Sequence, residues 1–354
     1  MLYVHSSNCI SPQQTFPETE LRELRESENN QLRVKEPAYT NVPPGILRRM
    51  ARAVRICVGA ALPLIQGIPE PDGIIIGTAN GGIEDCIKFL NQIIEYNEGL
   101  LSPGSFVQST SNAPAAQISL ISKNTNYNNT VTHRGLAFEN ALLDAVMLLK
   151  EKPDGIFLVG SVDEISDYNF NIDLLAGSFR KEIVSNRKLF DHPTIGTIAG
   201  EGVLMMTVSN QPEGSIARLN DLQTIHTSDE GLVLETLKQF LKRNGFPRIV
   251  PELLITGENG DIRLDKYYQA VEALFPENIS VARFKHLSGE YCTASSFGFW
   301  MATEILRNGK IPDIALKKGK KTGFNKILIY NNYRGMQHGF MLLGKAEALS
   351  SSKQ

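Results

Sequence analysis

The side chains most able to do covalent or metal chemistry are few in this sequence and lie far apart. Its four cysteines include no C-x-x-C pair, and its six histidines include no H-x-x-x-H pair. Structural zinc sites and redox or disulfide pairs depend on such spacings, because their groups must converge on one atom or one partner. We therefore expect no metal, no cofactor and no disulfide.

Cys292 and Thr132 are the residues that could act as nucleophiles. Cys292 follows Glu290 by two residues, and a nearby carboxylate can serve as a base when burial raises its pKa towards neutrality. A small buried core residue is the simpler interpretation of Cys292. Thr132 precedes His133, but consecutive side chains at the start of a helix diverge too far for an easy hydrogen bond.

The 354-residue chain has a globular composition, with 42% hydrophobic and 21% charged residues. Its net charge of −2 lacks the positive excess that holds proteins to nucleic-acid phosphates, so nucleic acid is not an expected partner. No apolar run approaches the roughly 20 residues needed to span a bilayer, and the N-terminus lacks the pattern of a secretory signal. These features predict a cytoplasmic protein without a membrane partner.

Short apolar runs with strand character alternate with longer runs of helical period, which is typical of an α/β fold with a largely buried sheet. The predicted strands are Gly73–Ile76, Gln117–Ser122, Gly155–Val159, Val203–Val208, Glu252–Thr256, Ser280–Phe284, Lys326–Tyr330 and Gly339–Leu343. The predicted helices are Ile46–Leu64, Ile83–Tyr96, Asp229–Asn244, Leu264–Phe275 and Thr293–Arg307. Residues 15–44 are predicted to be irregular, and residues 350–354 to be frayed.

The segment Leu136–Leu149 (LAFENALLDAVMLL) is apolar on nearly every side, whereas an ordinary surface helix has a single apolar face. The pattern predicts a central, buried helix. Glu139 and Asp144 nevertheless lie on it, and a buried carboxylate without a partner is costly. Each needs a partner such as Arg134, a backbone donor or another subunit.

Two segments half a chain apart share one pattern of residues. Ile74–Gly82 (IIIGTANGG) and Leu253–Asp261 (LLITGENGD) align without gaps, with Asn-Gly at Asn80 and Asn259. A strand, an Asn-Gly turn and a helix, repeated at this distance, predict two similar α/β halves. We place the N-terminal half at residues 1–228 and the C-terminal half at residues 229–354.

Several motifs, taken in order, resemble the ketoacyl synthase branch of the thiolase fold. They are a first strand and Ile-Ser-Pro turn at Val4–Pro12, the helix ILRRMARA at Ile46–Ala53, the turn GTANGG at Gly77–Gly82, the tunnel segment SPGSFVQSTSNAPAAQISL at Ser102–Leu120, LVGSVDE at Leu158–Glu164 and AGEGV at Ala199–Val203. The resemblance covers nearly the whole chain. It implies two pseudo-duplicated βαβ halves that form a layered α-β-α-β-α sandwich.

Members of that family condense acyl chains with a cysteine nucleophile and two histidines, and this sequence departs from the family at all three positions. The cysteine position, just before the predicted buried helix, falls on Gly135. The first histidine position falls on Asn259, and the second falls on Glu290. The lysine that precedes the second histidine in the family is retained as Lys285. The C-terminal glycine-rich gating loop becomes Tyr333–Met336 (YRGM). The resemblance therefore implies that no catalytic residue is intact.

By resemblance, the chain is similar to a chain-length factor, the non-catalytic subunit that pairs with an active ketosynthase and shapes its acyl tunnel in polyene, polyketide or fatty-acid type elongation. The implied partners are that ketosynthase and an acyl carrier protein. The tunnel-facing candidates are Phe106, Thr110, Ser111, Asn112, Ala113 and Phe138. The subunit-contact candidates are Arg134, Glu139 and Asp144. Carrier docking is suggested for Arg48, Arg49, Arg52 and Arg55, although a solvated helix face is the simpler interpretation of this arginine cluster.

Two other functions stay open. The chain could be an active β-ketoacyl synthase or acyltransferase with the non-standard nucleophile Cys292 or Thr132, or a stand-alone module that binds acyl carrier protein. Labelling by an acyl thioester, with Cys292→Ala as control, would identify the first. A stable monomer or homodimer on expression of the chain alone would favour the second.

Overall fold

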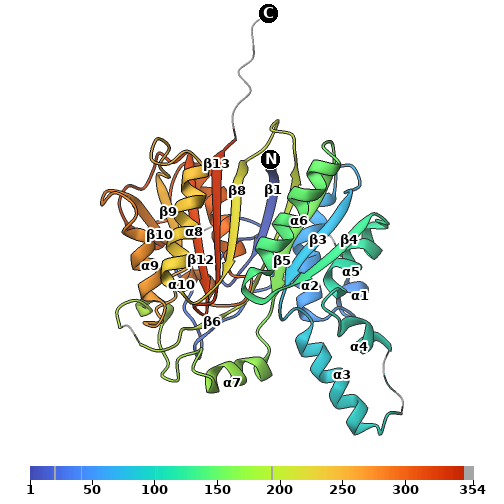
Figure 1. The fold of residues 1–354 in the computed structure, drawn as a ribbon. Helices are drawn as coiled ribbons and strands as arrows, with labels where there is room; N and C mark the ends of the chain where they lie inside the picture. Colours follow the sequence, from blue (N-terminus) through green and yellow to red (C-terminus); the bar gives the residue numbers. More distant parts are fainter. Residues whose placement is uncertain (20, 41, 100, 102, 193, 347–354) are drawn as a thin grey trace, which may run out of the picture.

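The computed structural model describes residues 1–346 except residues 20, 41, 100, 102 and 193, so the predicted frayed end at 350–354 and Ser102 of the tunnel segment lie outside the described residues. An 11-stranded mixed sheet runs through the molecule in the order β11-β10-β9-β12-β13-β8-β1-β7-β5-β3-β4 (Figure 1). Its strands are β1 Leu2–Ile10, β3 Gly73–Thr78, β4 Tyr127–Thr132, β5 Ile156–Asp163, β7 Gly202–Ser209, β8 Ala217–His226, β9 Leu253–Thr256, β10 Ser280–Arg283, β11 Leu316–Lys318, β12 Lys326–Tyr333 and β13 Gln337–Lys345. A small second sheet pairs β2 Gln31–Leu32 with β6 Ala199–Gly200.

Helices cover the sheet on both sides. The α-helices are α1 Pro44–Leu47, α2 Arg52–Ile65, α3 Ile83–Glu95, α4 Pro103–Gln108, α5 Ala113–Ser122, α6 Ala137–Glu151, α7 Asp167–Leu175, α8 Glu230–Arg243, α9 Asp265–Glu272, α10 Lys285–Ser288 and α11 Ser295–Asn308. Short 3-10 helices are η1 Arg134–Leu136, η2 Asn186–Lys188 and η3 Asp313–Ala315. Within the part of the chain that the structure describes, no helix is long and apolar enough to cross a membrane.

The sheet repeats one pairing pattern on either side of the contact between β1 and β8. On one side, β3 pairs in parallel with β4 and β5, and β5 pairs antiparallel with β7. On the other side, β9 pairs in parallel with β10 and β12, and β12 pairs antiparallel with β13. The strands β3 and β9 begin the two segments that share a sequence pattern, which supports two similar halves. Strand β8 precedes residue 228 and pairs with β13, which follows it, so the sheet is continuous across this position. The division at residue 228 stays a prediction.

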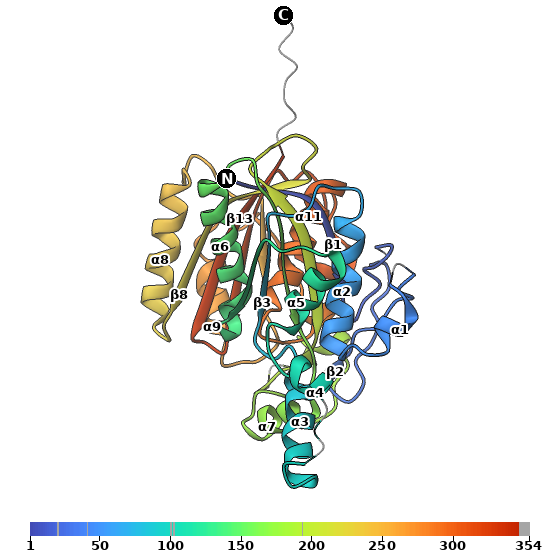
Figure 2. The ribbon, with the colours of Figure 1, turned by 90° about the vertical axis from the view of Figure 1, so that its right-hand side faces the viewer.

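Consecutive strand residues point to opposite sides of a sheet, and every residue of β3 and of β9 is buried, so these two strands are covered on both faces. In β3, Ile74 and Ile76 pack with α2 and α5, whereas Ile75 belongs to the core that contains α6 and α11. In β9, Ile255 joins that same central core, whereas Leu254 packs with α8 and α9. Figure 2 shows α8 and α2 on opposite sides of the strands. The resulting layers are the α-β-α-β-α sandwich that the sequence predicts.

Three sequence predictions about helices need correction. Ile46–Leu64 is not one helix, because the helix is interrupted between α1 and α2. At the interruption, the side chain of Gln108 accepts a hydrogen bond from the N–H of Ala51 and donates one to the carbonyl of Arg49. The predicted strand Gln117–Ser122 is the end of helix α5, because a short apolar run does not by itself distinguish a strand from a buried helix. The helix buried on almost every side is α11, whereas α6 leaves Met147 exposed on its outer flank.

Candidate functional site

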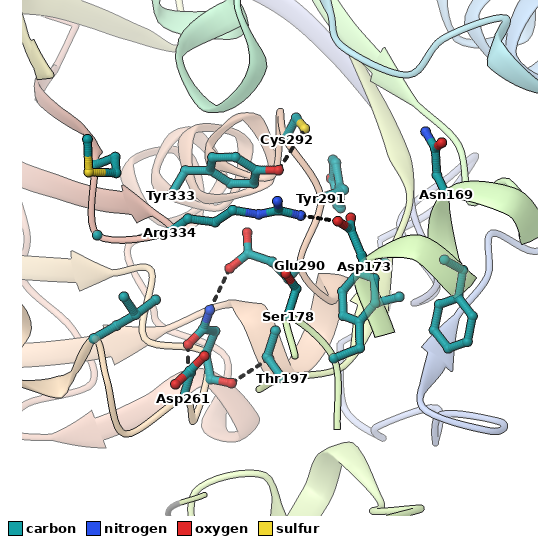
Figure 3. Close-up of a pocket in the computed structure, with 18 of the residues that line it drawn as sticks. Asn169, Asp173, Ser178, Thr197, Asp261, Glu290, Tyr291, Cys292, Tyr333 and Arg334 are labelled. Atoms are coloured by element: carbon teal, nitrogen blue, oxygen red, sulfur yellow. Dashed lines mark hydrogen bonds and ion pairs between the residues drawn. The ribbon is translucent and has the colours of Figure 1, made fainter. Parts of the chain in front are cut away.

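A cavity of about 340 Å³ lies where the carboxyl end of β9, the turn between β12 and β13, and helix α7 come together (Figure 3). Functional groups of α/β proteins commonly gather at the carboxyl ends of parallel strands. The residues that line the cavity include Glu164, Asp173, Asn259, Asp261, Glu290, Cys292, Tyr333 and Arg334. They come from both halves of the chain, so the fold brings distant segments to one site.

Two of the three positions that carry histidines in the resembling family meet at the cavity wall. Asn259 Nδ2 donates to Glu290 Oε2 at 2.6 Å. The fully buried Lys285 donates from Nζ to both oxygens of the same carboxylate, at 2.9 and 2.7 Å. The Glu290 carboxylate is therefore held by an ammonium and an amide. Both of its oxygens are engaged by partners of the same chain.

The position that carries the catalytic cysteine in the family is sealed by a tyrosine. A Cβ atom added to Gly135 would lie 2.2 Å from Cβ and 2.4 Å from Cγ of Tyr333. The same hairpin fixes the backbone here, because the N–H of Gly135 donates to Gln337 Oε1 at 2.9 Å. A side chain at residue 135 has no room while Tyr333 stays in place.

Cys292, the best remaining thiol of the sequence analysis, does line the cavity, but it is held as a neutral group. Its Sγ donates to the hydroxyl of Tyr333 at 3.2 Å (Figure 3). Burial, with the nearby carboxylate of Asp163, raises the pKa of the thiol to about 12. Because the thiolate is the reactive form, Cys292 is a weak nucleophile at neutral pH.

Thr132, the other candidate nucleophile, lies at the exposed end of β4 and does not line the cavity. The neighbouring His133 is also exposed, and its Nδ1 is 3.0 Å from Nδ2 of Asn140. His133 therefore turns towards α6. The structure brings Thr132 to none of the groups that would make it a catalytic nucleophile.

Asp163, which the sequence analysis did not single out, joins the two halves beside the cavity. Its Oδ1 accepts the N–H groups of Ala79 and Asn80, at 2.8 and 2.6 Å. Its Oδ2 accepts the N–H and the hydroxyl of Thr293, at 3.0 and 2.8 Å. The carboxylate thus fixes the GTANGG turn against the start of α11. The available signal was an acid at the end of a buried strand, in LVGSVDE.

Two ion pairs whose arginines are partly exposed lie in the cavity lining. Arg334, in the turn between β12 and β13, pairs with Asp173 of α7 at 2.6 Å (Figure 3). Arg263 pairs with Asp261 at 2.5 Å. Arg334 has a φ of 55°, a left-handed backbone conformation that is uncommon for a residue other than glycine. The residues of the first pair are far apart in sequence. Arg334 lies in the YRGM segment that the sequence analysis noted, whereas no motif marked Asp173.

The predicted tunnel residues do not line this cavity. Asn112 donates to Asn128 and Thr130 of strand β4, at 3.1 and 2.9 Å, so this segment lies along the edge of the sheet. Phe106 is 59% exposed, and Thr110 is exposed beside it. Ser111 is half-buried and Ala113 is buried. Phe138 packs in the core against Phe299, with ring centroids 5.5 Å apart. Any tunnel formed by these residues stays a prediction.

The three predicted subunit-contact residues occupy different environments. Arg134 is exposed at the start of η1. Asp144 accepts hydrogen bonds from Tyr127 and Asn129 of β4, at 3.0 and 2.8 Å, so its own chain supplies its partners. Glu139 is 0% exposed and lies against Gly339 of β13. Glu139 can therefore lie only behind a subunit contact and not at its surface, and its role there stays a prediction.

The buried Glu139 carboxyl makes the stability of the fold depend on pH. Burial raises its pKa from 4.5 to about 7, so the folded chain holds this proton more tightly than the unfolded chain, and stability falls as pH rises from about 4.5 to about 7. We expect Glu139→Gln to raise the free energy of unfolding at pH 8 by about 1–3 kcal/mol. Urea denaturation at pH 5 and pH 8 measures this, with the exposed Glu95→Gln as control. An unchanged pH dependence would contradict the assignment.

Two of the four arginines predicted to dock a carrier protein are occupied within the chain. Arg52 forms a two-point contact with the buried Glu201, both distances being 2.5 Å. Arg55 forms a two-point contact with Glu36, both distances being 2.6 Å. Arg48 and Arg49 are exposed. The predicted four-arginine docking face is therefore reduced to these two.

Comparison with known proteins agrees with the geometry. Residues 23–172 match the family model of the β-ketoacyl synthase N-terminal domain. No curated protein sequence matches the chain. Among solved structures, the ishigamide ketosynthase/chain length factor is 16% identical, with a TM-score of 0.78 over 98% of this chain and 99% of that chain. The ketosynthase ApeO in complex with its chain length factor ApeC, from Xenorhabdus doucetiae, is 13% identical, with a TM-score of 0.77 over 98% of each chain.

A β-ketoacyl synthase from Burkholderia phymatum has the same fold, at 11% identity and a TM-score of 0.75, over 98% of this chain and 99% of that chain. The chain therefore has the thiolase-like fold of the ketosynthases. The resemblance to the ketoacyl synthase branch, which the sequence motifs suggested, is confirmed.

Proposed function

We propose that this chain is a non-catalytic, chain-length-factor-like subunit that pairs with an active ketosynthase and contributes a wall of its acyl tunnel. The observation that carries the proposal is the contact between Gly135 and Tyr333: the site of the nucleophile has no side chain, and a tyrosine fills the space that one would need. Condensation requires a thiolate beside donors that stabilise the developing negative charge. A chain without that thiolate acts through its shape.

The other two catalytic positions support the same function. Asn259 and Glu290 bond to each other, and Lys285 neutralises the carboxylate. Their hydrogen-bonding capacity is thus spent inside the chain. Similar structures include complexes of a ketosynthase with a chain length factor and a polyketide ketosynthase in complex with an acyl carrier protein, which supports these two kinds of partner.

The edge strand β4 offers a surface for the partner subunit. Its neighbour in the sheet is β3, and its other edge is at the end of the strand order. An edge strand presents unpaired backbone groups that can pair with a second chain. The tunnel candidates Thr110 and Asn112, and the exposed Arg134, lie in segments that flank this strand. Pairing there would place them beside the partner.

Co-expression with a ketosynthase that has its cysteine and both histidines, from the same organism, tests the proposal. We expect a 1:1 complex by native mass spectrometry, and condensing activity that requires both chains. The chain alone is expected to show no condensation. Activity of the purified chain alone would overturn the proposal, and so would a stable homodimer that never associates with the ketosynthase or changes its product.

Larger side chains at the tunnel candidates are expected to shorten the product of the complex. In Thr110→Phe and Ser111→Phe, an aromatic ring would occupy space that the small native side chains leave open. Product lengths measured by mass spectrometry should shift towards shorter chains, while Thr322→Phe, exposed in the C-terminal half, should leave them unchanged. An unaltered distribution in both tunnel variants would remove these positions from the tunnel wall.

A further inference from the structure

The cavity has stayed open although the catalytic residues of the family are gone. Its volume of about 340 Å³ falls within the range of roughly 300–1,000 Å³ that is typical of small-molecule sites. Tyr333 separates it from Gly135, and the thiol of Cys292 is protonated and bonded to the same tyrosine. A molecule in this cavity would therefore meet no reactive nucleophile, and it would be held without a covalent bond.

Three acidic residues at the cavity have a cationic partner. Asp173 pairs with Arg334, Asp261 pairs with Arg263, and Glu290 pairs with Lys285 behind the wall. Of the other two charged residues in the lining, Lys266 places its Nζ over the ring of Tyr267, 4.8 Å from the ring centroid, and burial raises the pKa of Glu164 to about 7. An additional charge on a ligand would enter a partly buried site where the opposite charges already have partners, and such desolvation is costly. The cavity therefore favours a ligand without net charge.

Aromatic side chains form much of the remaining surface. The rings of Phe170 and Phe179 stack, with centroids 5.3 Å apart and planes inclined by 16°. Tyr267, Tyr291 and Tyr333 add three further rings to the lining. Surfaces of this kind gain free energy by covering a flat or chain-like apolar body.

Two polar groups in the wall lack hydrogen-bond partners. Glu164 is 5% exposed, and its Oε1 accepts no hydrogen bond from the described residues. The hydroxyl of Ser166, two residues further on, is also buried and without a partner there. Leaving buried polar groups unpaired costs free energy. If the side chains of Glu164 and Ser166 rotate towards the cavity, a ligand hydroxyl or amide N–H could bond to them and recover that cost.

We propose that the cavity is a non-covalent binding site for an uncharged, largely apolar small molecule that carries a hydrogen-bond donor. The ligand enters between the turn that carries Arg334 and helix α7, where the partly exposed Arg334–Asp173 ion pair lies (Figure 3). This inference goes beyond the proposed subunit role. The site belongs to this chain and needs no condensing activity, so each of the two proposals can fail without the other.

Three aromatic probes of similar size test the chemical class. Calorimetry at neutral pH, on the full chain or on its complex, compares 2-naphthol, 2-methoxynaphthalene and 2-naphthoate. We expect 2-naphthol to bind most tightly, 2-methoxynaphthalene several-fold more weakly because it has no donor, and the anion 2-naphthoate at least about tenfold more weakly than 2-naphthol. Equal affinity for the anion would overturn the charge argument, and equal affinity for the ether would overturn the role of the donor.

A matched pair of serine variants tests the location. Ser178 lines the cavity and is half-buried, whereas Ser215 is half-buried in the turn before β8 and is not among the residues that line the cavity. Ser178→Trp should fill the cavity and abolish binding of 2-naphthol, while Ser215→Trp should bind it like the native chain. Equal binding by the two variants would place the site elsewhere. Circular dichroism checks that both variants fold. Independently, changes in the chemical shifts of tyrosine signals when 2-naphthol is added to the native chain would locate the site by NMR spectroscopy.

The ion pair at the proposed entrance predicts a kinetic effect. Asp173→Asn removes the charge that holds Arg334 across the entrance. We expect the association rate of 2-naphthol to rise several-fold, with a smaller change in the dissociation constant, because the same contact is lost from the free and the bound chain. An unchanged association rate would show that the ligand does not enter past this pair.

Discussion

Replacing Gly135 with cysteine is expected to destabilise the fold by about 3 kcal/mol or more, and to create no condensing activity. The new Cβ would lie 2.2 Å from Cβ of Tyr333, well inside the contact distance of two carbon atoms. Both atoms belong to rigid positions: Gly135 is anchored through its N–H to Gln337, and Tyr333 is the last residue of β12. Neither can move without disturbing the hairpin.

Second-site variants separate this steric cause from a general intolerance of Gly135. In Gly135→Cys/Tyr333→Ala, the Cβ of residue 333 stays and the closest contact persists, so little stability should return. In Gly135→Cys/Tyr333→Gly, that Cβ is gone and most of the loss should be recovered relative to Tyr333→Gly alone. Urea denaturation measures all four variants. Equal rescue by alanine and glycine would show that the ring, rather than Cβ, causes the conflict.

The relieved double variant also tests the catalytic half of the argument. Its cysteine would face Asn259 and Glu290, which bond to each other, instead of two imidazoles. Because the enolate and the oxyanion would remain unstabilised, we expect no decarboxylative condensation. Robust activity would mean that other residues of the cavity supply those roles, and the proposed non-catalytic function would be wrong.

The sequence predicted the strands that carry strong apolar runs, because such runs are buried on both faces here. Ile74–Ile76 and Leu253–Ile255 are examples, and each lies in a strand with helices on both sides. Strands β4 and β8 were missed: YNNTVT and ARLNDLQTIH mix polar and apolar residues, since both strands are only half-buried. The segment Gln117–Ser122 was wrongly predicted to be a strand, because its apolar residues belong to helix α5, which packs on the sheet.

The sequence could show which catalytic residues are missing, but not what replaced them. Motif order alone placed the three family positions on Gly135, Asn259 and Glu290. That Tyr333 fills the space at Gly135 depends on a contact between segments about half the chain apart. Arg334 and Asp173 likewise meet only through the fold. No local pattern encodes such contacts, whereas Asp163, at the end of an apolar strand, was within reach of sequence reasoning.

Breaking the buried pair of Lys285 and Glu290 is expected to have the largest effect among changes away from Gly135. Glu290→Gln would leave the buried ammonium without a counter-charge, with neutral acceptors alone: the new amide oxygen and the carbonyl of Asn332, at 3.2 Å. Lys285→Met would leave the carboxylate with the single donor of Asn259. Removing one partner of a buried pair typically costs about 3–5 kcal/mol, because the remaining charge is desolvated without compensation.

The double variant Lys285→Met/Glu290→Gln removes both charges and should be more stable than either single variant, with a coupling energy of about 2 kcal/mol or more in urea denaturation. Lys88→Met, which disrupts the exposed pair with Asp85, serves as control and should change stability by less than about 1 kcal/mol. Additive losses from the two single variants would show that the carboxylate and the ammonium do not depend on each other. In that case, the paired charges at this wall would no longer support the proposed preference of the cavity for uncharged ligands.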